Sequence, residues 1–552
     1  MDWLPVILAA LPIAIVGSLM VFLSWPAKWA MPIGWATAAS IAAFWWNMPV
    51  RWIAASTIAG FINALNILLI VLGALMILQM LRKSGALEAI SISLSSVSKD
   101  RRIQVIIIAW LMVSFLEGAA GFGTPAAIAA PLLVGLGFPP LVAVICTLIG
   151  DSTAVTFGAV GVPIWGGFEP VRDLVRLPPG GTFADFLRIV GSFSAILHLA
   201  VGIFIPLIIV TTMTRITAGS FRQGLQVWPA ALFAGIAFAF PQALIAGLVS
   251  FEIPALLGAL VALPIFLFAV PSRFLAPRQI WDFPSHDRWP KEWEGEITAG
   301  HGAMTRNKHL SPWKAWLPYA VVGAVLTLTR LEFFGLTPIL RSITITWSNI
   351  LGTNVNEGIS PLYNPGIVPF LLVALVIPLM HGIDRREAIQ AVRETIKMIG
   401  PAAIALFFAL GMVYVMIHSG STSPRNSMLL VMAEAAARTV GGIWYVAAPF
   451  VGVLGSFISG SNTVSNIMFG VFQLSTAEQI GLPVAPILAL QAVGGAAGNM
   501  IAIHNIVAVL TTVGLLGKEG IVIRKNLPVA LFYALASGLV GWMLVSVCAV
   551  SS

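Results

Sequence analysis

The sequence predicts an all-α polytopic membrane protein with about 12 transmembrane helices plus two re-entrant helical hairpins in an inverted repeat. The first observation is composition: of 552 residues, 58% are hydrophobic and 9% are charged, whereas a soluble domain carries about 25% charge. The second is a series of apolar runs near the length of about 20 residues that crosses a bilayer. The third is a pair of shorter apolar runs, one in each half of the chain, interrupted by glycine-rich or polar segments.

The same composition excludes a soluble globule and a disordered chain. Two cysteines, Cys146 and Cys548, lie in separate apolar runs and are too few for a disulfide framework or a zinc site. We therefore expect no metal ion and no cofactor. Basic loops that set membrane topology account for the net charge of +8. The expected macromolecular environment is the lipid bilayer, with no nucleic acid.

We expect four segments along the chain. Two of them hold scaffold helices: residues 1–81, and residues 214–398 with a cytoplasmic loop over 271–313. The other two are the repeats. The first repeat, 82–213, contains a hairpin at 103–136 and a broken helix at 139–164. The second repeat, 399–552, contains a hairpin at 443–473, a broken helix at 484–515 and a last helix.

Both expected hairpins begin with an apolar run that is too short for a simple span. Only 14 residues separate Arg102 from Glu117, which is about 21 Å of helix against a hydrocarbon core about 30 Å thick. A glycine-rich stretch at 117–125 follows, and then a second short apolar run. This order predicts two half-helices joined at a tip. Residues 443–473 repeat the order, with a polar tip at 459–466.

The two halves share further features. The Ser-Phe pair and the glycine within 114–118 recur within 456–460, 342 residues later. Each hairpin precedes an apolar run with a helix-weakening interruption, at 150–153 in the first half and at 494–499 in the second. Irregular backbone at membrane depth is tolerated where it lines a cavity or is buried in protein. Paired interrupted helices in two halves indicate the binding site of a transporter.

The basic residues support one topology. If the first hairpin opens to the cytoplasm and the second to the outside, 22 of the 30 lysines and arginines lie in cytoplasmic segments and 8 lie outside. Cytoplasmic loops carry this excess in membrane proteins. The 271–311 loop is then cytoplasmic, and both chain termini lie outside. Treating either hairpin as one crossing helix would spoil the agreement.

The hairpin tips carry groups that can hold a carboxylate. Helix N-termini favour anions, because their first amides are unpaired and the helix dipole is positive there. Thr124 followed by Pro125 predicts a helix start with a hydroxyl N-cap, and neither tip nor break contains a lysine or arginine. The alternative is that the polar side chains of the tips only hold helices together. The candidate substrate-binding residues are Gly118, Gly121, Gly123, Thr124, Ser152, Thr153, Ser459, Ser461, Asn462, Thr463, Asn466 and Asn499.

Two acids lie deepest in the expected membrane segments: Glu117 at the first tip and Asp151 in the first break. Ionisable groups inside a membrane are rare and mark ion or proton pathways, so we assign both to proton coupling. The matching positions of the second repeat hold Ser459 and Gly495, so duplication does not explain the pair. His504, about a turn beyond the second break, is the third candidate, as a proton relay. The structural alternatives are a carboxyl group that locks the tip and a histidine that bonds a neighbouring helix.

At these segments the chain resembles the lactate permease family, bacterial inner-membrane carriers of L-lactate and related 2-hydroxy acids. The resemblance covers essentially the whole chain in length and order of spans. It implies uptake of lactate with protons by a multi-pass protein of the bacterial inner membrane. The residues that carry it are EGAAGFGTPAAIAAP at 117–131, GDST at 150–153, SGSNTVSN at 459–466 and GGAAGNM at 494–500.

The resemblance also implies a mechanism. The family is grouped with the ion transporter superfamily, whose dicarboxylate carriers use two hairpins and an elevator motion. Ser461-Asn462-Thr463 looks like the tip motif with which those carriers bind sodium and carboxylate. The first tip lacks this motif and has Ala119-Ala-Gly-Phe in its place, which argues against a symmetric pair of sodium sites.

The sequence thus predicts a secondary active transporter, not an enzyme. Its expected partners are a lactate or glycolate anion and a proton, imported together, with L-lactate, D-lactate and glycolate as the substrate range. The two tips and the two broken helices are expected to form the moving unit. Sodium-coupled carboxylate transport remains the alternative within the class, and an intramembrane enzyme or a channel the alternative outside it. The sequence leaves a homodimer open.

Overall fold

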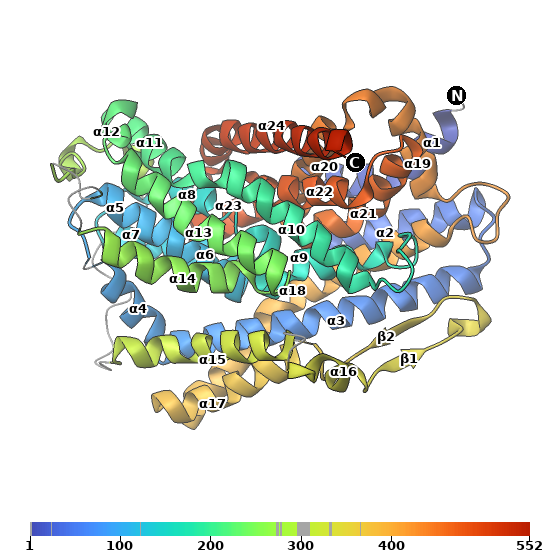
Figure 1. The fold of residues 1–552 in the computed structure, drawn as a ribbon, viewed down its shortest axis with the longest axis horizontal. Helices are drawn as coiled ribbons and strands as arrows, with labels where there is room; N and C mark the ends of the chain where they lie inside the picture. Colours follow the sequence, from blue (N-terminus) through green and yellow to red (C-terminus); the bar gives the residue numbers. More distant parts are fainter. Residues whose placement is uncertain are drawn as a thin grey trace.

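The computed structural model confirms an all-α polytopic membrane protein (Figure 1). It describes every residue except 1, 2, 24, 96, 122, 272–274, 276–278, 295–309, 331–333, 365 and 552. Much of the expected 271–313 loop therefore lies outside the described residues, as do both ends of the chain and one residue of the first tip.

Nine helical stretches of the described residues are long and apolar enough to cross a membrane, or ten if one bent pair counts as a span. The expected number of about 12 stays a prediction, since it also needs helices of intermediate length. The nine are α1 (Trp3–Val21), α3 (Val50–Lys83), the stretch Arg101–Ala119, α10 (Phe183–Val201) with α11 (Ile205–Ala218), α13 (Trp228–Leu248), α18 (Arg385–His418), α19 (Met428–Val440) with α20 (Trp444–Ser459), α22 (Val484–Gly498) with Asn499–Ile501, and most of α24 (Glu519–Ser551).

Shorter elements complete the described chain. Four apolar ones have 10–17 residues: α7 (Thr124–Gly135), α14 (Pro254–Ala269), Ile367–His381, which includes α17 (Leu372–His381), and α23 (Ile503–Thr512). The others that concern us are α2 (Ala27–Phe44), α4 (Ala86–Ser95), α12 (Phe221–Leu225), α15 (Pro312–Arg330) and α16 (Leu336–Arg341). A small antiparallel sheet of β1 (Ile345–Trp347) and β2 (Glu357–Ile359) was not predicted.

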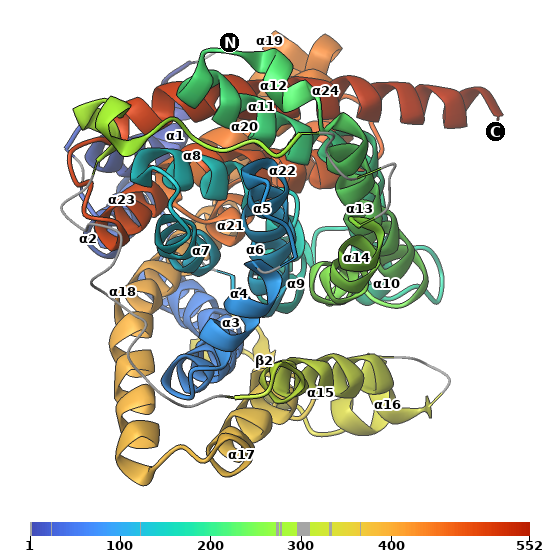
Figure 2. The same ribbon diagram turned by 90° about the vertical axis from the view of Figure 1, so that its left-hand side faces the viewer.

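The helices form two parts that meet along α3 and α18 (Figure 2). In one part, α15, α16, α17 and the strands lie around α3, while α18 packs along α2 and α3. The contact of α3 with α18 is close: a Cβ on Gly60 would lie 2.7 Å from the backbone of Leu410 and of Gly411. The other part contains both hairpins, both broken helices and the helices around them.

The first hairpin covers residues 101–135, against the expected 103–136. Its first arm, Arg101–Ala119, is long and apolar enough to cross a membrane, so a half-helix that stops partway stays a prediction. This arm runs from α5 (Arg101–Val105) through a π-helical stretch, Ile106–Met112, to α6 (Val113–Ala119), and it packs against α7. Gly121 and Gly123 in the tip have φ of +62° and +70°, which glycine adopts without steric cost. The expected hydroxyl cap is wrong: Gly123 is the N-cap of α7, and the Thr124 hydroxyl donates to the Gly121 carbonyl at 2.8 Å.

The second hairpin consists of α20 and α21 (Asn462–Gln479), which pack against each other. Gly460 turns the chain with φ of +73°. Ser461 then caps α21, because its side chain accepts a hydrogen bond from the Val464 amide at 3.4 Å. Here a hydroxyl N-cap does begin the second arm.

The first broken helix interrupts where the sequence predicts. Helix α8 (Pro140–Gly150) ends at Gly150, and the chain bends by 62° before continuing from Val155. A second irregularity was not predicted. In α9 (Gly158–Trp165), Ala159 and Val160 have φ of +43° and +57°, a region that costs residues other than glycine about 1–3 kcal/mol. Strained backbone of this kind suggests a constraint set by function.

The second break lies later than predicted. Gly494 to Gly498 stay helical within α22, and the helix gives way only at Asn499–Ile501, ahead of Ala502. These glycines permit close packing instead: a Cβ on Gly494 would lie 1.9 Å from the Pro449 carbonyl oxygen of α20. The expected interruption at 494–499 is therefore corrected to 499–502.

Candidate functional site

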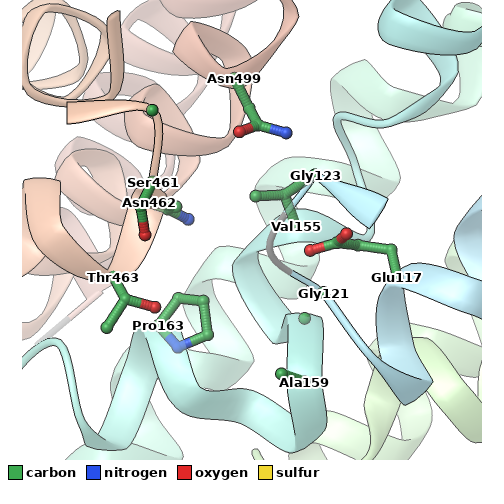
Figure 3. Close-up of a pocket in the computed structure, with 12 residues that line it drawn as sticks. Glu117, Gly121, Gly123, Val155, Ala159, Pro163, Ser461, Asn462, Thr463 and Asn499 are labelled. Atoms are coloured by element: carbon green, nitrogen blue, oxygen red, sulfur yellow. The ribbon is translucent and has the colours of Figure 1, made fainter. Parts of the chain in front are cut away.

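The two hairpin tips, far apart in the sequence, line one small cavity (Figure 3). Its volume is about 20 Å³, which is enough for one water molecule. No lysine or arginine is among the residues that line it, so its charge comes from one acid and from helix ends. The lining consists of Glu117, Gly121 and Gly123 from the first tip, Val155, Gly158, Ala159 and Pro163 from the first broken helix, and Gly460, Ser461, Asn462, Thr463 and Asn499 from the second half.

An acid pair lies at the side of this cavity formed by the first half. The carboxyl groups of Glu117 and Asp151, both buried, are close enough to share a hydrogen bond. A carboxylate can only accept hydrogen bonds, so a bond between two carboxyl groups requires a proton on one of them. Glu117 Oε2 and Asp151 Oδ1 are buried oxygens without a hydrogen-bond partner. The arrangement can therefore hold one proton between two groups.

Gly158 makes room for the acid pair. A Cβ on Gly158 would lie 2.1 Å from Glu117 Oε1, so the carboxyl group rests directly on the backbone of the first broken helix. Figure 3 shows the Glu117 side chain reaching into the cavity from this side, opposite Ser461 and Thr463. Only glycine at 158 allows this position.

The second tip contributes polar groups and a helix N-terminus. The Asn462 amide donates to the Ala492 carbonyl of α22 at 3.0 Å. The Asn462 Oδ1 atom lies against Gly495, because a Cβ on that glycine would be only 2.0 Å from this oxygen. Helices α7 and α21 both begin at the cavity, and the first turn of each presents backbone amides and a positive dipole. Two such ends without a nearby cation suit a small carboxylate.

Asn499 connects the second break with the acid pair. Its amide lies 3.5 Å from Asp151 Oδ2 and 3.4 Å from the Asp151 carbonyl. Asn505 in turn donates to Asn499 Oδ1 at 2.6 Å and lies against the first tip, 2.8 Å from a Cβ on Gly123. Asn499 of the second break thus contacts the acid pair, and Asn505 of α23 contacts the first tip.

Four other candidates of the first half do not line the cavity. Gly118 allows α6 to approach α14, because a Cβ there would lie 2.3 Å from the Leu256 amide. Thr124 bonds within its own tip. The Ser152 hydroxyl donates to the Ile149 carbonyl at 2.7 Å, and the Thr153 hydroxyl lies 3.2 Å from the Tyr533 hydroxyl. These four residues shape the tip and the break and do not line the cavity.

Three candidates of the second half also lie outside the lining. The Ser459 hydroxyl donates to the Gly455 carbonyl and accepts from the Ser461 amide. Asn466 donates to the Pro163 carbonyl of the first broken helix at 2.8 Å, so it joins the two halves. His504 is exposed on α23 beside Gly460. The structure brings together the two acids but leaves His504 apart from them.

Sequence reasoning missed several residues of this region. Val155, Ala159 and Pro163 line the cavity through a turn that no sequence pattern marks. Asn505 was visible as a polar residue just beyond the second break. Tyr533 lies in the last helix with no motif around it. Within the described residues, no group of three or more His, Cys, Asp or Glu side chains could hold a metal ion.

Comparisons with known proteins agree on one family. A sequence model described as L-lactate permease matches residues 5–548. A putative L-lactate permease of Haemophilus influenzae is 32% identical, with 85% of each chain covered. The L-lactate permease of Bacillus subtilis is 29% identical, over 82% of this chain and 80% of the relative. The glycolate permease GlcA of Escherichia coli is 26% identical, over 85% and 83%. The chain therefore belongs to the L-lactate permease family, as a multi-pass membrane transporter.

Proposed function

We propose that this protein imports L-lactate, and related 2-hydroxy monocarboxylates such as D-lactate and glycolate, by proton symport across the bacterial inner membrane. The observation that carries the proposal is the cavity that both hairpin tips line, with the acid pair at its side and no lysine or arginine in its lining. Relatives named L-lactate permease and glycolate permease support this substrate class.

The cavity offers each part of such a substrate a partner. The carboxylate would lie at the N-termini of α7 and α21, and the 2-hydroxyl group would bond Ser461, Thr463 or Asn499, which line the same cavity. A cavity of about 20 Å³ is smaller than a lactate ion, so the substrate needs a more open form of the site. We infer an elevator motion in which re-entrant tips and both broken helices move together as one unit against α3 and α18.

Proton coupling follows from charge balance. Moving one anion into a cell against an inside-negative potential costs about 2.3 kcal/mol of free energy per 100 mV. A proton that enters with the anion cancels this cost. Glu117 and Asp151 would carry the proton, because their contact needs one. With the proton bound, the pair carries one negative charge less, and the anion meets less repulsion.

Uptake of labelled L-lactate into proteoliposomes tests the proposal. We expect accumulation when the vesicle interior is more alkaline than the medium, competition by unlabelled glycolate, and no requirement for sodium. Vesicles that hold the Glu117→Gln variant serve as the matched control for coupling. Absence of lactate and glycolate uptake under every imposed gradient would contradict the proposal.

A sodium-coupled carrier is the second candidate. Asn462 Oδ1 and Asn466 Oδ1 are buried acceptors without a hydrogen-bond partner, and transporters of related design coordinate sodium with oxygen atoms beside broken helices. The same vesicles decide the question: uptake that follows an imposed sodium gradient at equal pH on both sides would favour this candidate over proton symport.

Topology is part of the proposal. The distribution of basic residues supports a cytoplasmic 271–311 loop and chain termini on the outside. A cysteine introduced at Ala299, which lies outside the described residues, should react with an impermeant thiol reagent only after the cells are opened. Reaction on intact cells would contradict this orientation.

A further inference from the structure

A buried chain of hydrogen-bonding side chains lies beside the cavity and outside its lining. His198 of α10 contacts two hydroxyl groups: its Nδ1 lies 2.6 Å from the Tyr533 oxygen of α24, and its Nε2 lies 2.8 Å from Thr156 Oγ1. The Tyr533 oxygen also lies 3.2 Å from Thr153 Oγ1. All four side chains are at most 1% exposed, so each hydroxyl or ring proton needs a partner within the protein.

The geometry fixes a direction for these bonds. Thr156 Oγ1 donates to the Ala492 carbonyl oxygen at 3.4 Å, so it must accept from His198, whose proton is then on Nε2. His198 Nδ1, without a proton, accepts from the Tyr533 hydroxyl, and the Tyr533 oxygen accepts from Thr153. We assign the histidine as neutral with its proton on Nε2, because this assignment satisfies every donor in the chain.

Both ends of the chain reach the candidate site. At one end, Thr153 follows Asp151 and Ser152 in the first break, and its carbonyl accepts from Gln242 at 3.3 Å. At the other end, the Ala492 carbonyl that Thr156 bonds also accepts from the Asn462 amide at 3.0 Å. Asn462 lines the cavity in the second tip. One carbonyl therefore joins the first broken helix to the second hairpin.

We propose that His198, held by Tyr533 and Thr156, is a positioning residue that fixes the first break relative to the Asn462 tip and so sets the affinity of the site for its carboxylate substrate. The role in transport rests on the proposed function; the positioning itself does not. No member of the chain needs to touch the substrate. These hydrogen bonds position Asp151, through the first break, at one end and Asn462, through the Ala492 carbonyl, at the other.

Substitutions can separate hydrogen bonding from packing. Thr156→Val keeps the volume of the side chain and removes its hydroxyl, which leaves His198 Nε2 without an acceptor. Thr156→Ser keeps the hydroxyl and removes a methyl group. Tyr533→Phe removes one hydroxyl and keeps the ring that packs against His198, with centroids 5.9 Å apart. The matched control is Tyr319→Phe, because Tyr319 is equally buried and its hydroxyl has no partner.

Substrate affinity is the first readout. Leaving a buried polar group unpaired costs enough to change an equilibrium by about tenfold, so we expect Thr156→Val and Tyr533→Phe to raise KM for L-lactate by about tenfold with a smaller change in the maximal rate. Thr156→Ser and Tyr319→Phe should stay within about twofold of the parent. A mere packing role predicts the reverse order for the two Thr156 variants, and that order would overturn the proposal.

Hydrogen exchange provides a readout that needs no substrate. In detergent-solubilised full-length protein, Tyr533→Phe and Thr156→Val should speed amide exchange in peptides that cover 151–158 and 460–465, while Tyr319→Phe should leave both unchanged. Unchanged exchange in both segments would overturn the positioning role, whichever substrate the parent carries. If the parent carries neither lactate nor glycolate yet exchange responds as expected, the proposed function fails and the positioning role stands.

Discussion

The carboxyl group of Glu117, at the end of one hairpin arm, meets the carboxyl group of Asp151, at the end of the first half of a broken helix. Two segments that each stop inside the protein are needed to bring them together. Asn499 of the second half lies against Asp151 from the other side. The acid pair thus lies where the two halves of the chain meet.

The first prediction concerns coupling. Glu117→Gln and Asp151→Asn should abolish accumulation of lactate driven by a proton gradient, because the neutral amide can neither take up nor release the proton. Exchange of internal for external lactate should continue, since the amide resembles the protonated acid. Glu478→Gln is the control, because the Glu478 side chain lies near the end of the second hairpin and is 38% exposed. Full accumulation in both variants with unchanged pH dependence would show that another group carries the ion.

Gly158 gives a second prediction. Gly158→Ala would place a methyl group 2.1 Å from Glu117 Oε1, so the carboxyl group must move away from the broken helix. We expect a folded protein at normal yield whose proton-driven uptake falls by at least about tenfold. Gly400→Ala is the control, because a Cβ there meets nothing within 4 Å. Equal uptake by both variants would show that the place of the Glu117 carboxyl group does not matter.

Glu357 predicts a pH dependence of stability. This residue of β2 lies outside the candidate spans and accepts bonds from the Tyr414 hydroxyl at 2.9 Å and the Gly358 amide at 3.1 Å. Burial, and then the negative charge of Glu169, raise its pKa from 4.5 to about 7. Between these values the folded protein keeps a proton that the unfolded chain releases, so the contribution of Glu357 to stability falls as pH rises through this window.

The variant Glu357→Gln isolates this effect. It cannot ionise, so its melting temperature in detergent should fall less than that of the parent between pH 4.5 and about 7. The difference between the two proteins, measured at closely spaced pH values, removes the contribution of every other titrating group. Parallel curves across the window would contradict a raised pKa for Glu357.

A buried ion pair at the start of the first hairpin gives a prediction about stability. Arg102 bonds Asp100 at 2.7 Å, both side chains are 1% exposed, and the same guanidinium donates to the carbonyls of Gln223 and Gln279. Arg102→Met leaves the buried Asp100 carboxylate without its cation, with only backbone amides at 102 and 281 still donating to it, which costs about 3–5 kcal/mol. Arg188→Met breaks a pair whose side chains are 47% exposed and should cost about 0–1 kcal/mol. Similar melting temperatures for the two variants would contradict this account.

Much of the fold was predictable, because the signals were local. The short run between Arg102 and Glu117, the glycines of the first tip and the polar second tip predict two hairpins. The observed arms cover 101–135 and 444–479, against the expected 103–136 and 443–473. The break after Gly150 was also located correctly, since small polar residues there follow a strong apolar helix.

The errors share a physical cause. A glycine that breaks a helix and a glycine that admits a neighbouring helix look alike in a sequence. The sequence predicts a break at Gly494 and Gly495, but Gly494 lies against α20 and Gly495 against Asn462. The roles of His198 and Tyr533 depend on contacts between helices that are hundreds of residues apart, and one sequence contains no record of such contacts.

Proton movement caused by substrate tests the central claim most directly. Proteoliposomes loaded with a pH-sensitive dye, without sodium and without an imposed gradient, receive external L-lactate, and protein-free vesicles correct for passive entry of lactic acid. We predict acidification of the interior by the parent protein above this background and its loss in Asp151→Asn. Lactate entry through the parent without acidification, or entry only when sodium is present, would contradict proton symport through the Glu117–Asp151 pair.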